Sequence, residues 1–154
     1  MTKLLMVCMG NICRSPMAQS VAQKLAADAM LLNHLKIDSA GTHAARLGER
    51  PDRRAEAALL NRGYEMGRIR SRRITSQDFH NFDMILAMDA SNLADLRRIC
   101  PPEHLGKLHM FLDFAEGRRD SDIPDPYYGN AQGFEHVLDL CEAGARGLMK
   151  RYTG

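Results

Sequence analysis

Residues 7–16, VCMGNICRSP, decide how the chain folds. The apolar run from Lys3 to Val7 comes directly before this stretch and predicts a short, buried parallel strand. After it, apolar residues recur at helical spacing, at Met17, Val21, Leu25, Ala29 and Leu32. We expect Ser15 to cap this helix, because serine is favoured at an N-cap and Pro16 suits the first helical position. The stretch is therefore predicted to form a tight turn from a strand into a helix.

The composition indicates one domain that spans residues 1–154. The chain has 154 residues, of which 45% are hydrophobic, enough for one domain of ordinary size with a sizeable core. Its 21 Lys and Arg residues and 19 Asp and Glu residues give a net charge of +2. Because domains that bind nucleic acid are usually more basic, we expect no nucleic-acid partner.

The apolar residues and the cysteines indicate where in the cell the protein is located. The chain has no run of about 18 apolar residues, so we expect no membrane span. Its N-terminal sequence, MTKLLMVCMGN, has too short an apolar run for a signal peptide. We therefore expect a cytoplasmic protein with reduced thiols at Cys8, Cys13, Cys100 and Cys141. Structural zinc needs two close pairs of ligands, and Cys8 and Cys13 have no second pair, so we expect no metal.

Further strands and helices alternate along the rest of the chain. The predicted strands are 37–40, 82–88 and 105–111. The predicted helices are 52–62, 89–100 and 130–152, the first two with Asp52 and either Asp89 or Ser91 at their start. This alternation predicts an α/β fold: about four parallel strands with helices on both faces. Ligands of such sheets bind beyond the carboxyl ends of the strands, where the opening stretch lies.

The turn itself has the features of a phosphate-binding loop, formed by Met9, Gly10, Asn11, Ile12, Cys13 and Arg14. A tight loop of this length that enters a helix turns its backbone N–H groups inward, around a tetrahedral dianion. Gly10 and Asn11 tolerate the backbone angles that such a loop needs. Arg14 offers a planar fork to two phosphoryl oxygens.

The field that favours phosphate also favours a thiolate at Cys8, to which Ser15 could donate a hydrogen bond. The chemistry indicated is attack of Cys8 on phosphorus, with a cysteinyl-phosphate intermediate. The alternative is an inert core cysteine at a strand end and a surface charge at Arg14. The strand before the loop, the helix after it and the Gly-Asn pair inside it favour the phosphate loop.

Four segments resemble the low-molecular-weight protein tyrosine phosphatases. They are VCMGNICRSPMAQ at 7–19, DSAGT at 38–42, FDMILAMDASNLADL at 82–96 and DPYYGN at 125–130. The resemblance covers nearly the whole chain in the family's order. It implies a four-stranded parallel sheet and hydrolysis of phosphotyrosine without a metal or other cofactor. It also implies a catalytic Cys, Arg and Asp, which match Cys8, Arg14 and Asp125.

A phenolate leaving group needs a proton, so the chain must also supply an acid. Candidates in the loop before the last helix are Asp113, Asp120, Asp122 and Asp125. Asp125 is favoured because Pro124 and Pro126 stiffen its backbone and because Tyr127 and Tyr128 could wall a slot for a phenyl ring. The resemblance gives this Asp the role of general acid and base. The alternative is a Pro-Asp-Pro turn whose tyrosines pack on the core.

Other residues are expected to support the loop or to shape its rim. Family members use matching residues to hold the loop, which suggests that Asn11 contacts Ser39. Cys13 either fills space beneath the loop or, as the resemblance implies, forms a disulfide with Cys8 that protects it from irreversible oxidation. Many relatives carry a bulky aromatic near Ala45, so Ala45 and Arg46 predict a shallower, more basic rim.

The arginine-rich segment 67–73, GRIRSRR, has two interpretations. It either forms a solvated face of the protein or steers anionic substrates toward the site. Steering of this kind would weaken as salt is added.

The resemblance also bears on partners. It implies a phosphotyrosine-containing protein as substrate, which in bacterial relatives is often a tyrosine kinase of polysaccharide export, and inorganic phosphate as product or competitive ligand. A thioredoxin-coupled arsenate reductase is the main alternative on this fold. It needs two further cysteines close together after the third strand, and only Cys100 is near, so we disfavour it. A phosphotyrosine-binding module should lack the nucleophile or the acid, and both are present.

Overall fold

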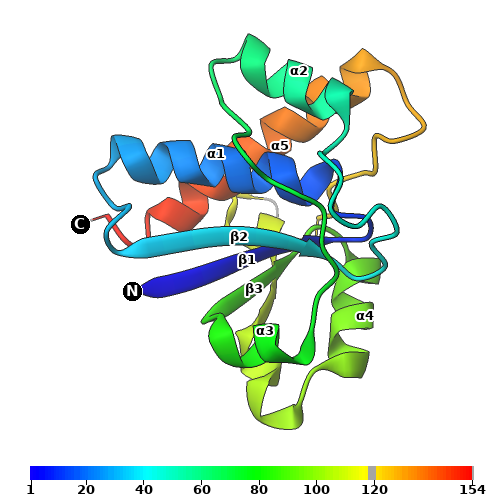
Figure 1. Cartoon of the computed structure of the whole chain (residues 1–154). Coiled ribbons are helices and arrows are strands. Elements are labelled where there is room, and N and C mark those ends of the chain that lie inside the picture. Colours follow the sequence, from blue (N-terminus) through cyan, green and yellow to red (C-terminus); the bar gives the residue numbers. More distant parts are fainter. Residues whose placement is uncertain (118–120, 154) are drawn as a thin grey trace.

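The computed structural model describes residues 1–117 and 121–153, and these form one sheet with helices on both faces (Figure 1). The four strands are β1 (Thr2–Cys8), β2 (Leu35–Gly41), β3 (Met84–Ala87) and β4 (Leu108–Met110). All pairs are parallel, in the order β2-β1-β3-β4. The predicted α/β fold with a four-stranded parallel sheet is therefore confirmed.

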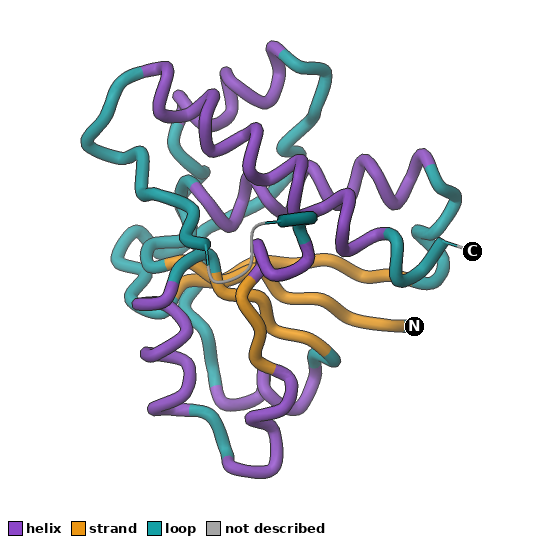
Figure 2. The backbone as a smooth tube through the Cα atoms, turned by 180° about the vertical axis from the view of Figure 1, so that it is seen from behind, coloured by secondary structure: helices purple, strands orange, loops and turns teal. Residues whose placement is uncertain are grey.

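The helices form two layers, which both views of the backbone show (Figures 1 and 2). One face of the sheet carries α1 (Arg14–Asp28), α5 (Ala131–Met149) and, beside α5, α2 (Arg53–Asn61). The other face carries α3 (Ser76–Asn81) and α4 (Ala90–Ile99). Among the described residues, no helix combines the length and apolar character needed to cross a bilayer.

Strand β1 lies in the middle of the sheet and alternates between the two cores. Leu4 and Met6 belong to the core beneath α1 and α5, whereas Leu5 and Val7 belong to the core beneath α4. Cys8 has the same parity as Leu4 and Met6, so it belongs to the α1 side. The last residue of β1 therefore faces the start of α1.

The strand order places the end of β1 at the topological switch point of the sheet. From β1 the chain passes through α1 to β2 on one side, and from β3 through α4 to β4 on the other. Such a reversal opens a crevice beyond the carboxyl ends of the two central strands. The end of β3 is held level with that of β1, because the Met88 N–H donates to the Val7 carbonyl at 3.0 Å.

The predicted limits of the first helix were wrong at both ends. Helix α1 begins at Arg14, its N-cap is Cys13, and no side chain caps it. Ser15 lies inside the helix, where its hydroxyl contacts Cys8 instead. At the other end the helix stops at Asp28, and Met30 adopts a left-handed φ of 59°. Leu32, predicted on the buried stripe, is 52% exposed.

Other predicted elements differ in extent. Residues 102–107, which overlap the predicted strand 105–111, form a 3-10 helix that shortens β4 to three residues. Helix α3 was not predicted, because six residues are too few for a helical repeat to stand out. The predicted caps Asp52 and Asp89 do accept hydrogen bonds from the N–H groups of Arg54 and Asn92.

Candidate active site

The loop between β1 and α1 surrounds the sulfur of Cys8 with hydrogen-bond donors. The Asn11 N–H donates to Cys8 Sγ at 3.3 Å, and Ser15 Oγ lies 3.0 Å from the same sulfur. Asn11 Nδ2 donates to Ser15 Oγ at 2.9 Å, and the serine's own hydrogen can point either at the sulfur or at the Ala40 carbonyl, which is 3.5 Å away. Donors of this kind stabilise the charged form of a thiol over the neutral one.

Asn11 holds the loop from within. It is fully buried and adopts a left-handed φ of 56°. Its Nδ2 also donates to Ser39 Oγ at 3.0 Å, so the structure places together the two residues expected to meet. Its Oδ1 accepts from the Arg72 N–H at 2.9 Å, a contact that the sequence did not indicate. Asn11 thus joins the loop to β2 and to the segment before α3.

Gly41, at the end of β2, lets the loop lie close to the sheet. A Cβ at this position would lie 2.6 Å from the Met9 carbonyl oxygen and 3.1 Å from the backbone nitrogen of Asn11. A larger residue would push the loop away from β2. The close approach of the loop therefore explains on steric grounds why the motif DSAGT has a glycine at position 41.

Arg14 is buried among carboxylates at the base of the site. Its Nη1 donates to Asp89 Oδ2 at 2.5 Å and to the Ile123 carbonyl at 3.1 Å. Its Nη2 lies 3.8 Å from Asp125 Oδ2. Burial lowers the pKa of Arg14, but the nearby Cys8 and the two carboxylates outweigh burial and raise it. The guanidinium is therefore a permanent positive charge beside Cys8.

Asp89 is a site residue that sequence reasoning treated only as a helix cap. Its Oδ1 does cap α4, accepting from the Asn92 N–H at 2.6 Å, while its Oδ2 binds Arg14. Both contacts are possible because β3 ends beside β1 and delivers Asp89 to the crevice. The motif at 82–96 contained this residue, but only the strand order shows what it contacts.

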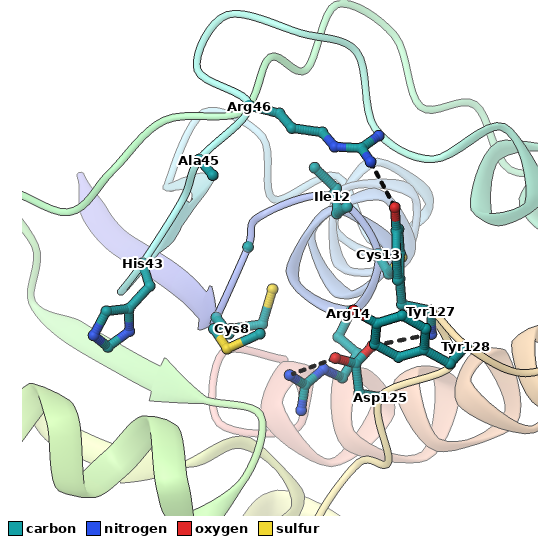
Figure 3. Close-up of a pocket in the computed structure, with 12 residues that line it drawn as sticks. Cys8, Ile12, Cys13, Arg14, His43, Ala45, Arg46, Asp125, Tyr127 and Tyr128 are labelled. Atoms are coloured by element: carbon teal, nitrogen blue, oxygen red, sulfur yellow. Dashed lines mark hydrogen bonds and ion pairs between the residues drawn. The ribbon is translucent and has the colours of Figure 1, made fainter.

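Asp125 lies beside the Arg14 guanidinium, on the loop that precedes α5 (Figure 3). Its Oδ1 accepts from the Tyr127 N–H at 3.1 Å, which fixes the carboxyl group relative to the aromatic wall. Of the other candidate acids, Asp113 and Asp122 do not line the cavity that Asp125 lines, and Asp122 accepts from the Ala90 N–H. Asp120 lies outside the described residues.

These groups line one cavity of about 170 Å³ (Figure 3). Its walls are Cys8, Met9, Gly10, Ile12, Cys13, Arg14, His43, Ala45, Arg46, Asp125, Tyr127 and Tyr128. The predicted rim residues Ala45, Arg46, Tyr127 and Tyr128 are all among them, whereas His43 was not singled out from the sequence. Asn11 is buried behind the loop and does not line the cavity.

The aromatic wall is tied to the opposite rim. Arg46 Nη2 donates to Tyr127 Oη at 2.6 Å across the mouth (Figure 3). Arg54, from α2, donates to the Tyr127 carbonyl at 2.8 Å. The Tyr127 and Tyr128 rings meet edge to face, with centroids 4.9 Å apart. The slot above Cys8 is therefore walled by Tyr127, which two arginines hold in place, and by the exposed Tyr128, whose ring packs against Tyr127.

Cys13 and Cys8 line the same cavity, and both are free thiols. Burial and the nearby carboxylate of Asp52 raise the pKa of Cys13 well above its ordinary value. Cys100 and Cys141 lie in the two cores, and burial raises the pKa of Cys141 as well. Across the part of the chain that the structure describes, no cluster of three or more His, Cys, Asp or Glu side chains could hold a metal ion.

The arginine-rich segment 67–73 divides into two parts. Arg72 pairs with Asp78 at 3.0 Å and Asp38 at 3.2 Å, and Arg73 donates to the Ala44 carbonyl at 2.8 Å. These two arginines therefore have structural contacts. Arg68 and Arg70 are exposed and line a groove separate from the active-site cavity.

Comparison with known proteins agrees with this geometry. The family model of the low molecular weight phosphotyrosine protein phosphatases matches residues 3–153. A low molecular weight protein-tyrosine-phosphatase of Streptomyces coelicolor is 40% identical, covering 93% of this chain and 88% of its own. The human low molecular weight phosphotyrosine protein phosphatase is 38% identical, and the match covers 96% of this chain and 94% of the human protein.

Solved structures show the same fold. A protein tyrosine phosphatase from Entamoeba histolytica, crystallised with Hepes in the active site, is 38% identical and superposes with a TM-score of 0.94 over 99% of this chain and 97% of its own. Vibrio vulnificus Wzb in complex with benzylphosphonate is 30% identical and superposes with a TM-score of 0.85 over 97% of this chain and 98% of its own. The chain belongs to the low molecular weight phosphotyrosine protein phosphatase family, as the four motifs predicted.

Proposed function

We propose that this protein hydrolyses phosphotyrosine in proteins, and small aryl phosphates, through a cysteinyl-phosphate intermediate on Cys8. One observation carries the proposal: Cys8 Sγ accepts hydrogen bonds at the base of a cavity that Arg14 and Asp125 also line. A nucleophile, a phosphate ligand and a proton donor thus face the same small volume.

In the first step the Cys8 thiolate attacks phosphorus, so that an S–P bond forms while the bond from phosphorus to the phenol oxygen breaks. Arg14 and the N–H groups of the loop bind the phosphoryl oxygens, whose charge they balance throughout the reaction. The protonated carboxyl group of Asp125 gives its proton to the departing phenolate. Tyr127 and Tyr128 hold the phenyl ring in the slot above the loop.

In the second step water cleaves the intermediate. The Asp125 carboxylate, now deprotonated, takes a proton from that water, whose oxygen bonds to phosphorus as the S–P bond breaks. The Cys8 sulfur leaves as a thiolate, which the Ser15 hydroxyl and the Asn11 N–H stabilise. The products are the free enzyme and inorganic phosphate, which can also bind the same loop as a competitive ligand.

The size of the cavity and its two tyrosines support an aryl phosphate as substrate. The relative Wzb was solved with benzylphosphonate, a phosphonate attached to a ring through one carbon, which fits the same interpretation. A bacterial tyrosine kinase of polysaccharide export, indicated by the resemblance, stays a prediction for the protein partner.

Cys13 is proposed as the redox partner of Cys8. Peroxide would convert the Cys8 thiolate to a sulfenic acid, which then condenses with the Cys13 thiol to give a disulfide and water. We expect peroxide inactivation of the wild type to be reversed by dithiothreitol, and that of Cys13→Ser to be largely irreversible. Equal recovery of both proteins would remove Cys13 from this role.

The test of the main proposal is p-nitrophenyl phosphate hydrolysis near pH 6 with EDTA present. Wild-type activity that is absent in Cys8→Ser, while the variant still binds phosphate, supports the thiolate mechanism. No activity in the reduced wild type would refute it and would direct attention to arsenate-dependent consumption of reduced thioredoxin.

A further inference from the structure

A second groove opens beside the mouth of the active-site cavity. Its walls come from residues 46–56, between β2 and the first turn of α2, together with Ile12 of the phosphate-binding loop. We call it the arginine groove, because Arg46, Arg50, Arg53 and Arg54 line it. Its volume is about 720 Å³, against about 170 Å³ for the active-site cavity. Ile12 and Arg46 line both, so the two hollows are contiguous.

Two of these arginines are neutralised within the protein. Arg54 makes a two-pronged ion pair with Asp52, through Nε at 3.1 Å and Nη2 at 3.0 Å. Arg50 Nη2 lies 2.6 Å from Glu56 Oε2. Their charges are therefore offset by carboxylates that line the same groove.

The other two arginines keep an unbalanced charge. Within the described residues, no carboxylate contacts Arg46 or Arg53, and both are exposed. Arg46 donates one N–H to the Tyr127 hydroxyl, which leaves other donors of its guanidinium available. The groove also contains one carboxylate, Glu49, that forms no ion pair with any residue the structure describes, and this carboxylate works against anion binding. Among the described residues, the arginine groove therefore holds two arginines without an ion pair, Arg46 and Arg53, and one such carboxylate, Glu49.

We propose that the arginine groove binds an acidic side chain that flanks the phosphotyrosine of a protein substrate. The inference rests on the proposed function, since it assumes that a phosphotyrosine occupies the cavity. Arg46, which belongs to both hollows, then contacts the residues next to the phosphotyrosine, and Arg53 reaches those further along. Both act as specificity-determining residues and touch no reacting atom.

The test compares two phosphotyrosine peptides that differ only in flanking residues, Glu in one and Gln in the other. The measured quantity is the ratio of their kcat/KM values, which cancels any change common to both. We expect the wild type to favour the Glu peptide by about threefold to tenfold, as a few exposed ion pairs allow. The ratio should fall toward 1 when the ionic strength is raised from about 50 mM to about 500 mM.

Variants of opposite charge sign separate electrostatics from distortion. Arg46→Gln and Arg53→Gln should each lower the ratio by about twofold to fivefold, whereas Glu49→Gln should raise it by a similar factor. Arg97→Gln is the matched control, because Arg97 is an exposed arginine on α4, which covers the opposite face of the sheet, and its ratio should equal that of the wild type.

Each failure has a distinct meaning. Hydrolysis of both peptides with a wild-type ratio of 1 would overturn the inference and leave the proposed function intact. A lowered ratio in Glu49→Gln as well as in Arg53→Gln would show that the groove acts through its shape, and would also overturn it. If neither peptide is hydrolysed, the proposed function and the inference fall together.

Discussion

Replacement of Asn11 tests the architecture on which the proposed chemistry depends. The side chain is fully buried and makes three hydrogen bonds: two from Nδ2, to Ser15 and Ser39, and one that Oδ1 accepts from the Arg72 N–H. Its φ of 56° lies in the left-handed region, which asparagine tolerates better than most residues with a Cβ. Asn11→Ala removes all three bonds and keeps the Cβ, whereas Asn11→Gly removes both the bonds and the Cβ.

The magnitude follows from these contacts. A buried hydrogen bond contributes about 1 kcal/mol net, so the three together give about 3 kcal/mol. An alanine at a left-handed φ costs about 1–2 kcal/mol more. A glycine avoids this strain, but its larger unfolded-state entropy offsets about half of that advantage over alanine. We therefore expect Asn11→Ala to lose about 4 kcal/mol of the free energy of unfolding. Asn11→Gly should lose about 0.5–1 kcal/mol less than Asn11→Ala.

The assay is urea denaturation of the three proteins, paired with the inhibition constant of inorganic phosphate. Stability should rank wild type, then Asn11→Gly, then Asn11→Ala, which reverses the usual order of glycine and alanine. Both variants should bind phosphate more weakly, because the loop's N–H groups lose their fixed orientation. Ser39→Ala removes one of the three Asn11 bonds, together with the bond that Ser39 Oγ donates to Gln19 Oε1 at 2.6 Å, and should cost about 2 kcal/mol.

Two results would refute the reasoning. A glycine variant less stable than the alanine variant would mean that residue 11 does not hold a left-handed backbone in solution. Unchanged phosphate inhibition in either variant would mean that the hydrogen bonds of Asn11 do not set the shape of the loop.

Three further predictions concern the acid, the core and the pH dependence of stability. Asp125→Asn should slow phosphotyrosine hydrolysis by about 100-fold or more and spare substrates whose leaving group needs no proton; equal losses in steady-state assays of both would exclude Asp125 as the acid. In α5, a Cβ at Gly147 would overlap the Phe114 carbonyl oxygen, whereas the atom nearest to a Cβ at Gly133 would be Cβ of Pro126, 3.7 Å away. Gly147→Ala should therefore cost about 3 kcal/mol and Gly133→Ala should not destabilise, as thermal melts can check. Burial and the hydrogen bond to Glu142 raise the pKa of Tyr64 to about 12, so the stability it contributes is complete below its unfolded pKa of about 10 and is lost as the pH rises toward 12. Urea denaturation between those pH values should show a steeper decline for wild type than for Tyr64→Phe, and parallel curves would contradict the assignment.

Much of the fold followed from local patterns. The apolar run before Cys8, the helical repeat after it and the caps at Asp52 and Asp89 are short-range signals, because each reflects hydrogen bonding or burial within a few residues. The errors came where such signals compete. Ser15 has the chemistry of a helix cap, but its hydroxyl contacts the Cys8 sulfur instead. Leu32 fits a helical repeat that Met30 has already ended.

The sequence by itself determined the turn from β1 into α1 that carries Cys8 and Arg14, the residues proposed as nucleophile and phosphate ligand, because these lie within ten residues and their geometry is set by one strand-to-helix turn. Only the tertiary structure decided what surrounds them. The strand order brings Asp89 to Arg14, separated by 75 residues, and the chain's return before α5 brings Asp125 to the same guanidinium. Such contacts depend on how the elements pack against one another, and the spacing of two residues along the chain does not indicate how far apart they lie in the folded protein.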